Sequence, residues 1–182
     1  VAAGVLLAPT AAGASDENVA VATNQTDGAA VAEASVQFRM APNGVIDEEN
    51  TAHALASCGD CQTLAVAFQL VLVPRDFHTL VPRNEAVAGN LACEECLTWA
   101  SAKQVFVVTG GPASLTGAGH QRIRDLEARV EALEAELPTL TLAELAAEVD
   151  AAFEELLDVA RTEVRRHDGG PQDAEVVATR SS

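Results

Sequence analysis

Two stretches of the chain repeat one another: NTAHALASCGDCQTLAVAFQLVLV at residues 50–73 and NEAVAGNLACEECLTWASAKQVFVV at residues 84–108. Each contains one Cys-x-x-Cys, and in both the first cysteine stands eleven positions before a glutamine. A degenerate third copy, NVAVATNQTDGAAVAEASVQFRM, occupies residues 18–40 and has Thr26 and Ala29 where the others have cysteine. Because self-similarity of this kind is the signature of a repeat architecture, we expect three copies of one structural unit.

Each copy has the pattern of a strand, a tight turn and a second strand. Alanine alternates with other residues in the first arms, and the second arms are rich in Val, Leu and Phe. Asp27-Gly28 and Gly59-Asp60 suit a hairpin turn, whereas Glu94-Glu95 is a poor turn pair, so an adjacent disulfide is expected to hold the third turn. The alternative is that the Ala-rich arms are helices, because alanine is the best helix former.

The pattern becomes helical after Gly119. Pro138 ends a first helix, and Thr141 to Glu144 has the form of a capping box for a second one that runs to about Arg166. Apolar residues recur at spacings of three and four along both helices. The predicted fold is therefore α+β: three β-hairpin units in an antiparallel sheet or small β-stack, followed by an antiparallel helical hairpin.

The sequence divides into four parts. Residues 1–14 form an uncharged apolar run that ends in small residues, which is typical of the end of an export signal or of a membrane segment, but it is shorter than the ~20 residues of a spanning helix. Residues 15–115 are the predicted β-repeat domain and residues 116–167 the helical hairpin. Residues 168–182 contain Gly, Pro and charges and are predicted to be a disordered tail.

Two polar positions recur in all three copies. Stacked units would bring equivalent residues into register, so the amides would form two ladders in which each side chain both donates and accepts. The alternative is that they are ordinary solvated strand residues. The two sets are Asn18, Asn50 and Asn84, and Gln37, Gln69 and Gln104.

Charge restricts the classes of partner. The 182 residues include 27 acids and 11 bases, for a formal net charge of −16. Such a field repels nucleic acid and anionic membrane surfaces, because affinity for either depends on neutralising negative charge with Lys and Arg. A protein partner, or self-association, is expected instead through the helical seam at residues 120–165.

The four cysteines are the main candidates for chemistry. Across a two-residue turn the flanking positions lie near the ~5.5 Å that a disulfide prefers, so Cys58–Cys61 and Cys93–Cys96 can close locally. The repeat also permits Cys58–Cys93 with Cys61–Cys96. Structural disulfides with no metal and no cofactor are the favoured interpretation. The alternatives are that the same four cysteines are the ligands of a zinc ion or form a redox pair.

Other catalytic motifs are missing from the sequence. The four histidines stand apart, and no His-Glu-x-x-His, Gly-x-Ser-x-Gly or phosphate-binding glycine loop occurs. The sequence therefore favours a protein without catalytic residues of its own.

A resemblance rests on the run from Ala56 to Val73, on Asn18 with Thr26-Asp27-Gly28 before it, and on CEEC at residues 93–96 with TGGP at residues 109–112 after it. Over about residues 18–115 the chain resembles uncharacterised actinobacterial exported or membrane-associated proteins, some of them described as peptide zinc metalloprotease proteins. The resemblance implies an extracytoplasmic location. Because this chain lacks the metal motif of such a protease, it would correspond to a non-catalytic portion, and no catalytic residue is carried over.

Two functions remain. The first is a secreted or extracytoplasmic structural or protein-interaction module, free or membrane-tethered, stabilised by disulfides and without catalytic residues. The second is a zinc-binding module, or the non-catalytic portion of a metalloprotease-like membrane protein.

Overall fold

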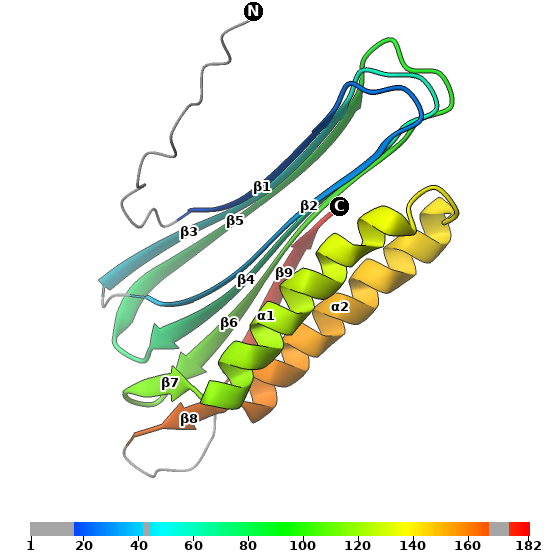
Figure 1. Cartoon of the computed structure of the whole chain (residues 1–182). Coiled ribbons are helices and arrows are strands. Elements are labelled where there is room, and N and C mark those ends of the chain that lie inside the picture. The colour runs from blue at the N-terminus through cyan, green and yellow to red at the C-terminus, as the bar shows by residue number, and fades with distance from the viewer. Residues whose placement is uncertain (1–16, 42–43, 168–174) are drawn as a thin grey trace, which may run out of the picture.

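The computed structural model describes residues 17–41, 44–167 and 175–182, which are mostly β-structure with two long helices (Figure 1). The strands of the repeats are β1 (Glu17–Asn24), β2 (Ala30–Met40), β3 (Gly44–Ala56), β4 (Gln62–Pro74), β5 (Phe77–Asn90) and β6 (Leu97–Thr109). The remaining elements are β7 (Ala113–Leu115), α1 (Gly117–Ala132), a 3-10 turn at Leu133–Ala135, α2 (Leu142–Thr162), β8 (Val164–Arg166) and β9 (Glu175–Ser181).

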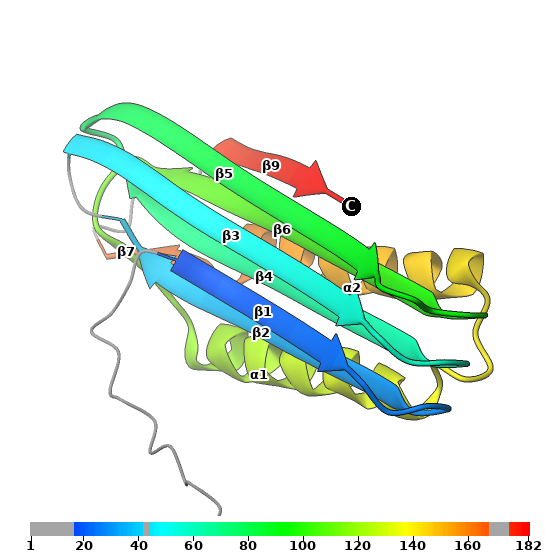
Figure 2. The same cartoon turned by 90° about the horizontal axis from the view of Figure 1, so that it is seen from above.

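The two arms of every repeat lie in different sheets. Sheet A has the order β1-β3-β5 and sheet B the order β2-β4-β6-β9, and the repeat strands of each sheet are parallel. Only β9 is antiparallel to its neighbour in sheet B. Each repeat is therefore one coil of a short, two-sided β-solenoid, in which the chain crosses from sheet A to sheet B at a turn (Figure 2).

The predicted α+β fold of antiparallel hairpins is wrong. The strand and turn positions are close to those expected, but each strand pairs with the equivalent strand of the next repeat instead of with its own partner arm. The physical reason lies in the second arms. A hairpin with one solvated face shows alternating hydrophobicity, whereas Leu64 to Val73 is apolar at every position except Gln69, which is typical of a parallel strand buried on both faces.

The interface between the sheets is built from alanine. Because the side chains of both inner faces are small, the two sheets can pack closely against each other. The buried members are Ala20, Ala22, Ala52, Ala54, Ala65, Ala67, Ala100 and Ala102. Alanine in these arms therefore serves sheet packing, and the helical alternative for the arms is excluded.

The opposite face of sheet B is covered by the two helices. Apolar side chains of β4 and β6, including Phe68 and Val105, pack against the apolar faces of α1 and α2 in one continuous core (Figure 1). Buried helical residues of this core include Ile123, Leu126, Val130, Leu145, Val149, Phe153 and Leu156. The seam that the sequence predicted as a site of association is thus buried inside the chain.

The helix ends follow from local sequence. The side chain of Thr116 accepts a hydrogen bond from the Gly119 amide at the start of α1. Thr141 and Glu144 form the predicted capping box at the start of α2, which confirms that boundary.

The chain end differs from its prediction. Residues 175–181 form β9 on the edge of sheet B, where a disordered tail was expected. The expected export segment at residues 1–14 and the tail residues 168–174 lie outside the described residues. Within the described part of the chain, no helix has the length and apolar character needed to cross a membrane.

Candidate functional site: the cysteine turns and the amide chain

The three turns between the sheets stack on one another at one end of the solenoid. The Gly28 amide donates to the Gly59 carbonyl at 2.9 Å, and the Asp60 amide donates to the Glu94 carbonyl at 2.9 Å. Backbone hydrogen bonds therefore continue from repeat to repeat through the turns, and side chains at equivalent turn positions come close together.

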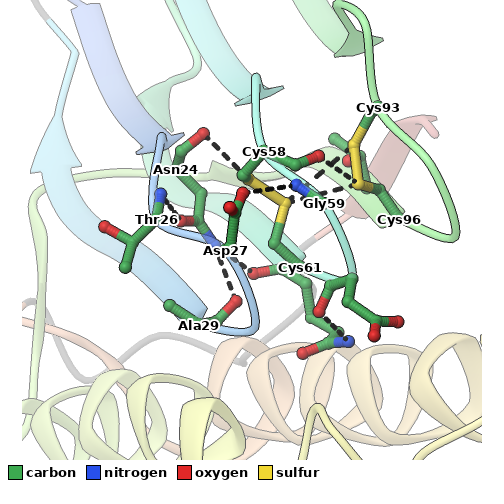
Figure 3. The surroundings of a disulfide bond; sticks show 12 residues. Asn24, Thr26, Asp27, Ala29, Cys58, Gly59, Cys61, Cys93 and Cys96 are labelled. Carbon is green, nitrogen blue, oxygen red and sulfur yellow. Dashed lines mark hydrogen bonds between the residues drawn. A yellow bond between two sulfur atoms is a disulfide. The ribbon is translucent and has the colours of Figure 1, made fainter.

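The cysteines pair locally within the second and third turns. Cys58 is bonded to Cys61 and Cys93 to Cys96, with Cα separations of 6.1 and 6.0 Å, and no cysteine is free (Figure 3). Both separations fall in the usual range for a disulfide. The structure therefore has the local connectivity and not the alternative that bridges the repeats.

The two cysteine pairs also touch each other. Cys61 Sγ lies 3.4 Å from Cys96 Sγ and 4.0 Å from Cys93 Sγ, because Cys61 and Cys96 precede the paired residues Gln62 and Leu97 of adjacent parallel strands. The sulfurs of Cys58, Cys61 and Cys96 all lie within 4.8 Å of one another. The four sulfur atoms thus form one cluster that spans two repeats.

The cluster is buried on one side and accessible on the other. Cys58 and Cys61 are 5% and 0% exposed, whereas Cys93 and Cys96 are half-buried. Acidic residues of all three turns surround an open hollow of about 600 Å³ beside it, and its lining includes Asp27, Asp60, Glu94 and Glu95. A small solute can therefore reach the outer pair from solvent.

Polar side chains hold the first turn, which has no cysteine. The Asn24 side chain accepts from the Thr26 amide at 3.1 Å and donates to the Ala29 carbonyl at 2.8 Å. Asp27 accepts from the Gly59 amide at 2.8 Å, and Gly28 has the expected positive φ of 69°. Thr26-Asp27-Gly28 is therefore a turn, as predicted, and it supports the second turn as well.

The cysteine turns contain non-glycine residues in the left-handed region. Asp60 and Glu95, each preceding the second cysteine of its pair, have φ of 56° and 57°. This conformation costs a residue with a side chain about 1–2 kcal/mol. Each disulfide closes the four-residue turn that contains this left-handed residue. This agrees with the expectation that a disulfide holds the third turn.

The asparagine ladder is present between the sheets. Asn18 donates to Asn50 at 2.7 Å and Asn50 donates to Asn84 at 2.9 Å, so every donor points toward the last repeat. Ser35 donates to Asn18 at 2.6 Å at the start of the row. Asn18 and Asn50 are 2% and 0% exposed, so the alternative that they are solvated strand residues is excluded.

The glutamine ladder runs in the opposite direction. Gln104 donates to Gln69 at 2.8 Å, and Gln69 donates to Gln37 at 2.8 Å. These donors point toward the first repeat, and Gln69 and Gln104 are fully buried.

Thr179 of β9 joins the two ladders. Its hydroxyl accepts from Asn84 and donates to Gln104 at 3.4 Å. One hydrogen-bond chain therefore runs from Ser35 through the asparagines to Thr179 and back through the glutamines to Gln37, and every member donates in the same direction. Such chains are cooperative, because each bond polarises the next.

Two charged residues are buried in the structure, and their burial was not predicted from the sequence. Lys103 of β6 is 3% exposed, pairs with Asp150 of α2 and lies 5.2 Å from the centre of the Phe153 ring. Glu48 of β3 is 1% exposed and lies 3.3 Å from Arg39. The signal for Lys103 was its place inside an apolar strand as the single lysine of the chain.

The histidines contact scattered neighbours. His53 pairs with Glu85 on sheet A, and His167 lies 2.9 Å from the Ser114 hydroxyl. Among the described residues, the one group of three or more metal-binding side chains with ligand atoms this close together is the cysteine cluster.

No family model matches the chain, and neither a curated protein nor a solved structure does. The resemblance to actinobacterial exported and metalloprotease-like proteins therefore stays a prediction from the sequence.

Proposed function

We propose that the protein is a non-catalytic, extracytoplasmic interaction module whose turns are stapled by disulfides and whose partner binds sheet A. The observation that carries the proposal is an asymmetry between the sheets. The helices cover the outer face of sheet B and carboxylates cap its β2 edge, whereas among the described residues no element covers the outer face of sheet A and no further strand pairs with its edges.

Sheet B is covered on its outer face and capped at its β2 edge, and β9 forms its other edge. The helices cover its outer face, and β9 occupies the edge at β6. At the β2 edge, two carboxylates accept backbone hydrogen bonds: Glu127 of α1 from the Val36 amide, and Glu134 of the 3-10 turn after α1 from the Ala32 amide, both at 3.2 Å. Covering an edge in this way is how proteins prevent unwanted strand pairing.

Sheet A has no comparable cover among the described residues. It ends at β1 on one side and β5 on the other, and no further strand pairs with either. Its outer face carries apolar side chains that are 39–49% exposed, namely Val19, Val21, Leu55 and Val87. Exposed apolar patches with polar borders are typical of protein-binding sites, and open edges accept an added strand.

Two cysteine pairs support a location outside the cytoplasm. Stable disulfides persist in oxidising compartments and are rare in the reducing cytosol. The apolar run at residues 1–14 agrees with export, although it lies outside the described residues. The net charge of −16 favours a neutral or basic protein partner over nucleic acid or an anionic membrane.

The prediction that residues 120–165 bind a partner stays a prediction, and it competes with sheet A. The outward faces of the helices carry ion pairs, such as Arg122 with Asp158 at 2.8 Å and Arg129 with Glu148 at 3.3 Å. Charged faces of this kind are generally solvated.

Photocrosslinking in the native host tests the location of the binding face. A crosslinking amino acid at Val21 or Val87 should give a discrete protein adduct, and the matched position Asp158 on the helices should give none. Adducts confined to Asp158 would overturn the assignment to sheet A. Adducts at none of these positions, with the protein at its native level, would overturn the interaction function itself.

A further inference from the structure

The cysteine cluster brings the sulfurs of Cys58, Cys61 and Cys96 within 4.8 Å of one another, and Cys93 Sγ lies 4.0 Å from Cys61 Sγ. We propose that the two disulfides are one state of a switchable site, and that reduction converts Cys58, Cys61, Cys93 and Cys96 into the four ligands of one thiophilic divalent cation such as Zn²⁺. This inference goes beyond the proposed interaction function, because it concerns the regulation of the turns and not the binding face.

The distances between the pairs already suit the metal. A tetrahedral site with Zn–S bonds of ~2.3 Å separates its sulfurs by about 3.8 Å. Cys61 Sγ lies 3.4 Å from Cys96 Sγ and 4.0 Å from Cys93 Sγ, which brackets that value. The sulfurs within each bonded pair must move apart, and Cys93 Sγ, which is not among the three mutually close sulfurs, must move closer to Cys58 Sγ. The Cα atoms of the pairs, 6.1 and 6.0 Å apart, leave room for these side-chain rotations.

The backbone brings the ligands together without help from the metal. Cys61 and Cys96 directly precede a paired position of adjacent parallel strands, and the Asp60 amide bonds to the Glu94 carbonyl between the same two turns. The site therefore rests on the solenoid itself, so that a reduced chain keeps the four thiols near one another.

The surroundings of the sulfurs are acidic and partly open to solvent. Asp27, Asp60, Glu94 and Glu95 line a hollow over the three turns, and the outer cysteine pair of the third turn is half-buried. A cleft lined by charges of one sign raises the local concentration of counter-ions, here cations. The same carboxylates raise the cost of forming thiolates, and binding of the divalent cation must offset that cost.

The conversion balances with a dithiol as reductant. Two dithiol molecules break the two S–S bonds, supply four electrons and four protons, and each become a disulfide. The four thiols then lose their protons as the cation binds. Reoxidation by two molecules of a disulfide, or of another two-electron oxidant, removes four electrons, releases the cation and restores both bonds.

Metal titration of the full chain tests the proposal. The chain is reduced with excess dithiol, freed of reductant without oxygen and titrated with Co²⁺ and then Zn²⁺, with native mass spectrometry as the second readout. One ion per chain is expected, with the absorption of a tetrahedral cobalt–thiolate centre, and the oxidised chain should bind none. No ion, two ions per chain, or one ion shared by two chains would each overturn the single four-sulfur site.

Variants keep the test specific. Cys61→Ser, which removes the central sulfur, and the double variant Cys93→Ser/Cys96→Ser should lose stoichiometric binding, whereas Asn90→Ala beside the third turn should keep it. If reduction abolishes the β-sheet signal in circular dichroism, the chain is refolded with Zn²⁺ present, and failure to recover one bound ion also overturns the proposal. Two disulfides in the native protein together with no metal binding after reduction would reject this inference alone and leave the proposed interaction function untouched.

Discussion

Thr179 occupies the point where the two amide ladders meet. Its hydroxyl is the acceptor for Asn84 and the donor for Gln104, so one residue of β9 closes a hydrogen-bond chain that crosses all three repeats. A buried amide that loses its partner bears the full cost of desolvation, and that cost exceeds the net gain from forming the bond.

Replacing Thr179 should therefore weaken the molecule more than its size suggests. Thr179→Val keeps the shape but removes both bonds, and we expect a loss of about 1–3 kcal/mol in the free energy of unfolding. Thr179→Ser keeps the hydroxyl and is the matched control, with most of the stability retained. Chemical denaturation measures both, and equal losses in the two variants would contradict the role of the hydroxyl.

Lys103 and Asp150 form an ion pair in which one side chain is buried and the other exposed. We therefore expect substitutions of the two residues to change the free energy of unfolding by different amounts. Lys103 is 3% exposed and Asp150 is 62% exposed. Asp150→Ala leaves a buried ammonium without its partner and should cost about 2–4 kcal/mol, whereas Lys103→Met removes the buried charge and should change stability by less than about 1 kcal/mol. Thermal unfolding of the two variants tests this order, and a larger loss for Lys103→Met would refute it.

Single residues were predicted from the sequence where the repeat constrained them. Recurrence alone identified both amide ladders, because in-register stacking aligns identical residues. Thr179 and Lys103 could not be found this way, since Thr179 lies outside the repeats and the equivalents of Lys103, which are Val36 and Phe68, are apolar.

At the scale of elements, α1 both covers a face of sheet B and caps its edge. Glu127 of α1 and Glu134 of the 3-10 turn that continues it are seven residues apart and reach amides four residues apart on β2. Two helical turns and four strand residues span similar lengths, about 10 and 13 Å, which explains the match.

Removing these caps should expose a strand edge. The double variant Glu127→Ala/Glu134→Ala is expected to aggregate faster than the parent on mild heating, because unpaired backbone groups of β2 become available to other chains. Glu131→Ala, on the same helix without a bond to the strand, is the matched control. Light scattering measures the rate, and an unchanged rate in the double variant would contradict the capping role.

The start of α2 should respond to acid. Hydrogen bonds from the Thr141 amide and hydroxyl hold the pKa of Glu144 below its ordinary value. A carboxylate with a lowered pKa stabilises the folded state above its unfolded pKa, and that contribution disappears as the pH falls through its folded pKa. Glu144→Gln should therefore flatten the loss of stability below about pH 4.5, measured by urea unfolding across pH. An unchanged pH profile would contradict this account.

The pairing of the elements was harder to predict than their positions. A strand, a short turn and a strand describe both a hairpin and an arch between two sheets, and the turn residues Asp27-Gly28 suit either. The apolar positions on both faces of β4, broken only by Gln69 between Leu64 and Val73, were the available signal for parallel strands buried on both faces. β9 carried a weak signal, since Glu175–Ser181 is short and half exposed.

At the scale of the whole molecule, the helices cover the outer face of sheet B, whereas no described element covers the outer face of sheet A. Sheet B carries the helices, the edge caps and β9, and it fixes sheet A through the alanine interface and the amide chain. A binding face built on such a support changes little in shape when a partner docks, which lowers the entropic cost of association.

Each disulfide constrains one turn between the two sheets and links no other elements. A four-residue loop gains only about 2 kcal/mol from closure in the chain-entropy estimate, so the bonds stiffen two turns without carrying the fold. The first turn, held by Asn24 and Asp27, shows that the same geometry can be kept by hydrogen bonds.

Intact-mass and peptide mapping of the protein taken directly from its host into an alkylating agent is the most direct test of a disulfide-stapled module outside the cytoplasm. The account predicts a mass about four hydrogens below that of the reduced chain, with Cys58 linked to Cys61 and Cys93 linked to Cys96. Four alkylated thiols in the native protein would contradict it.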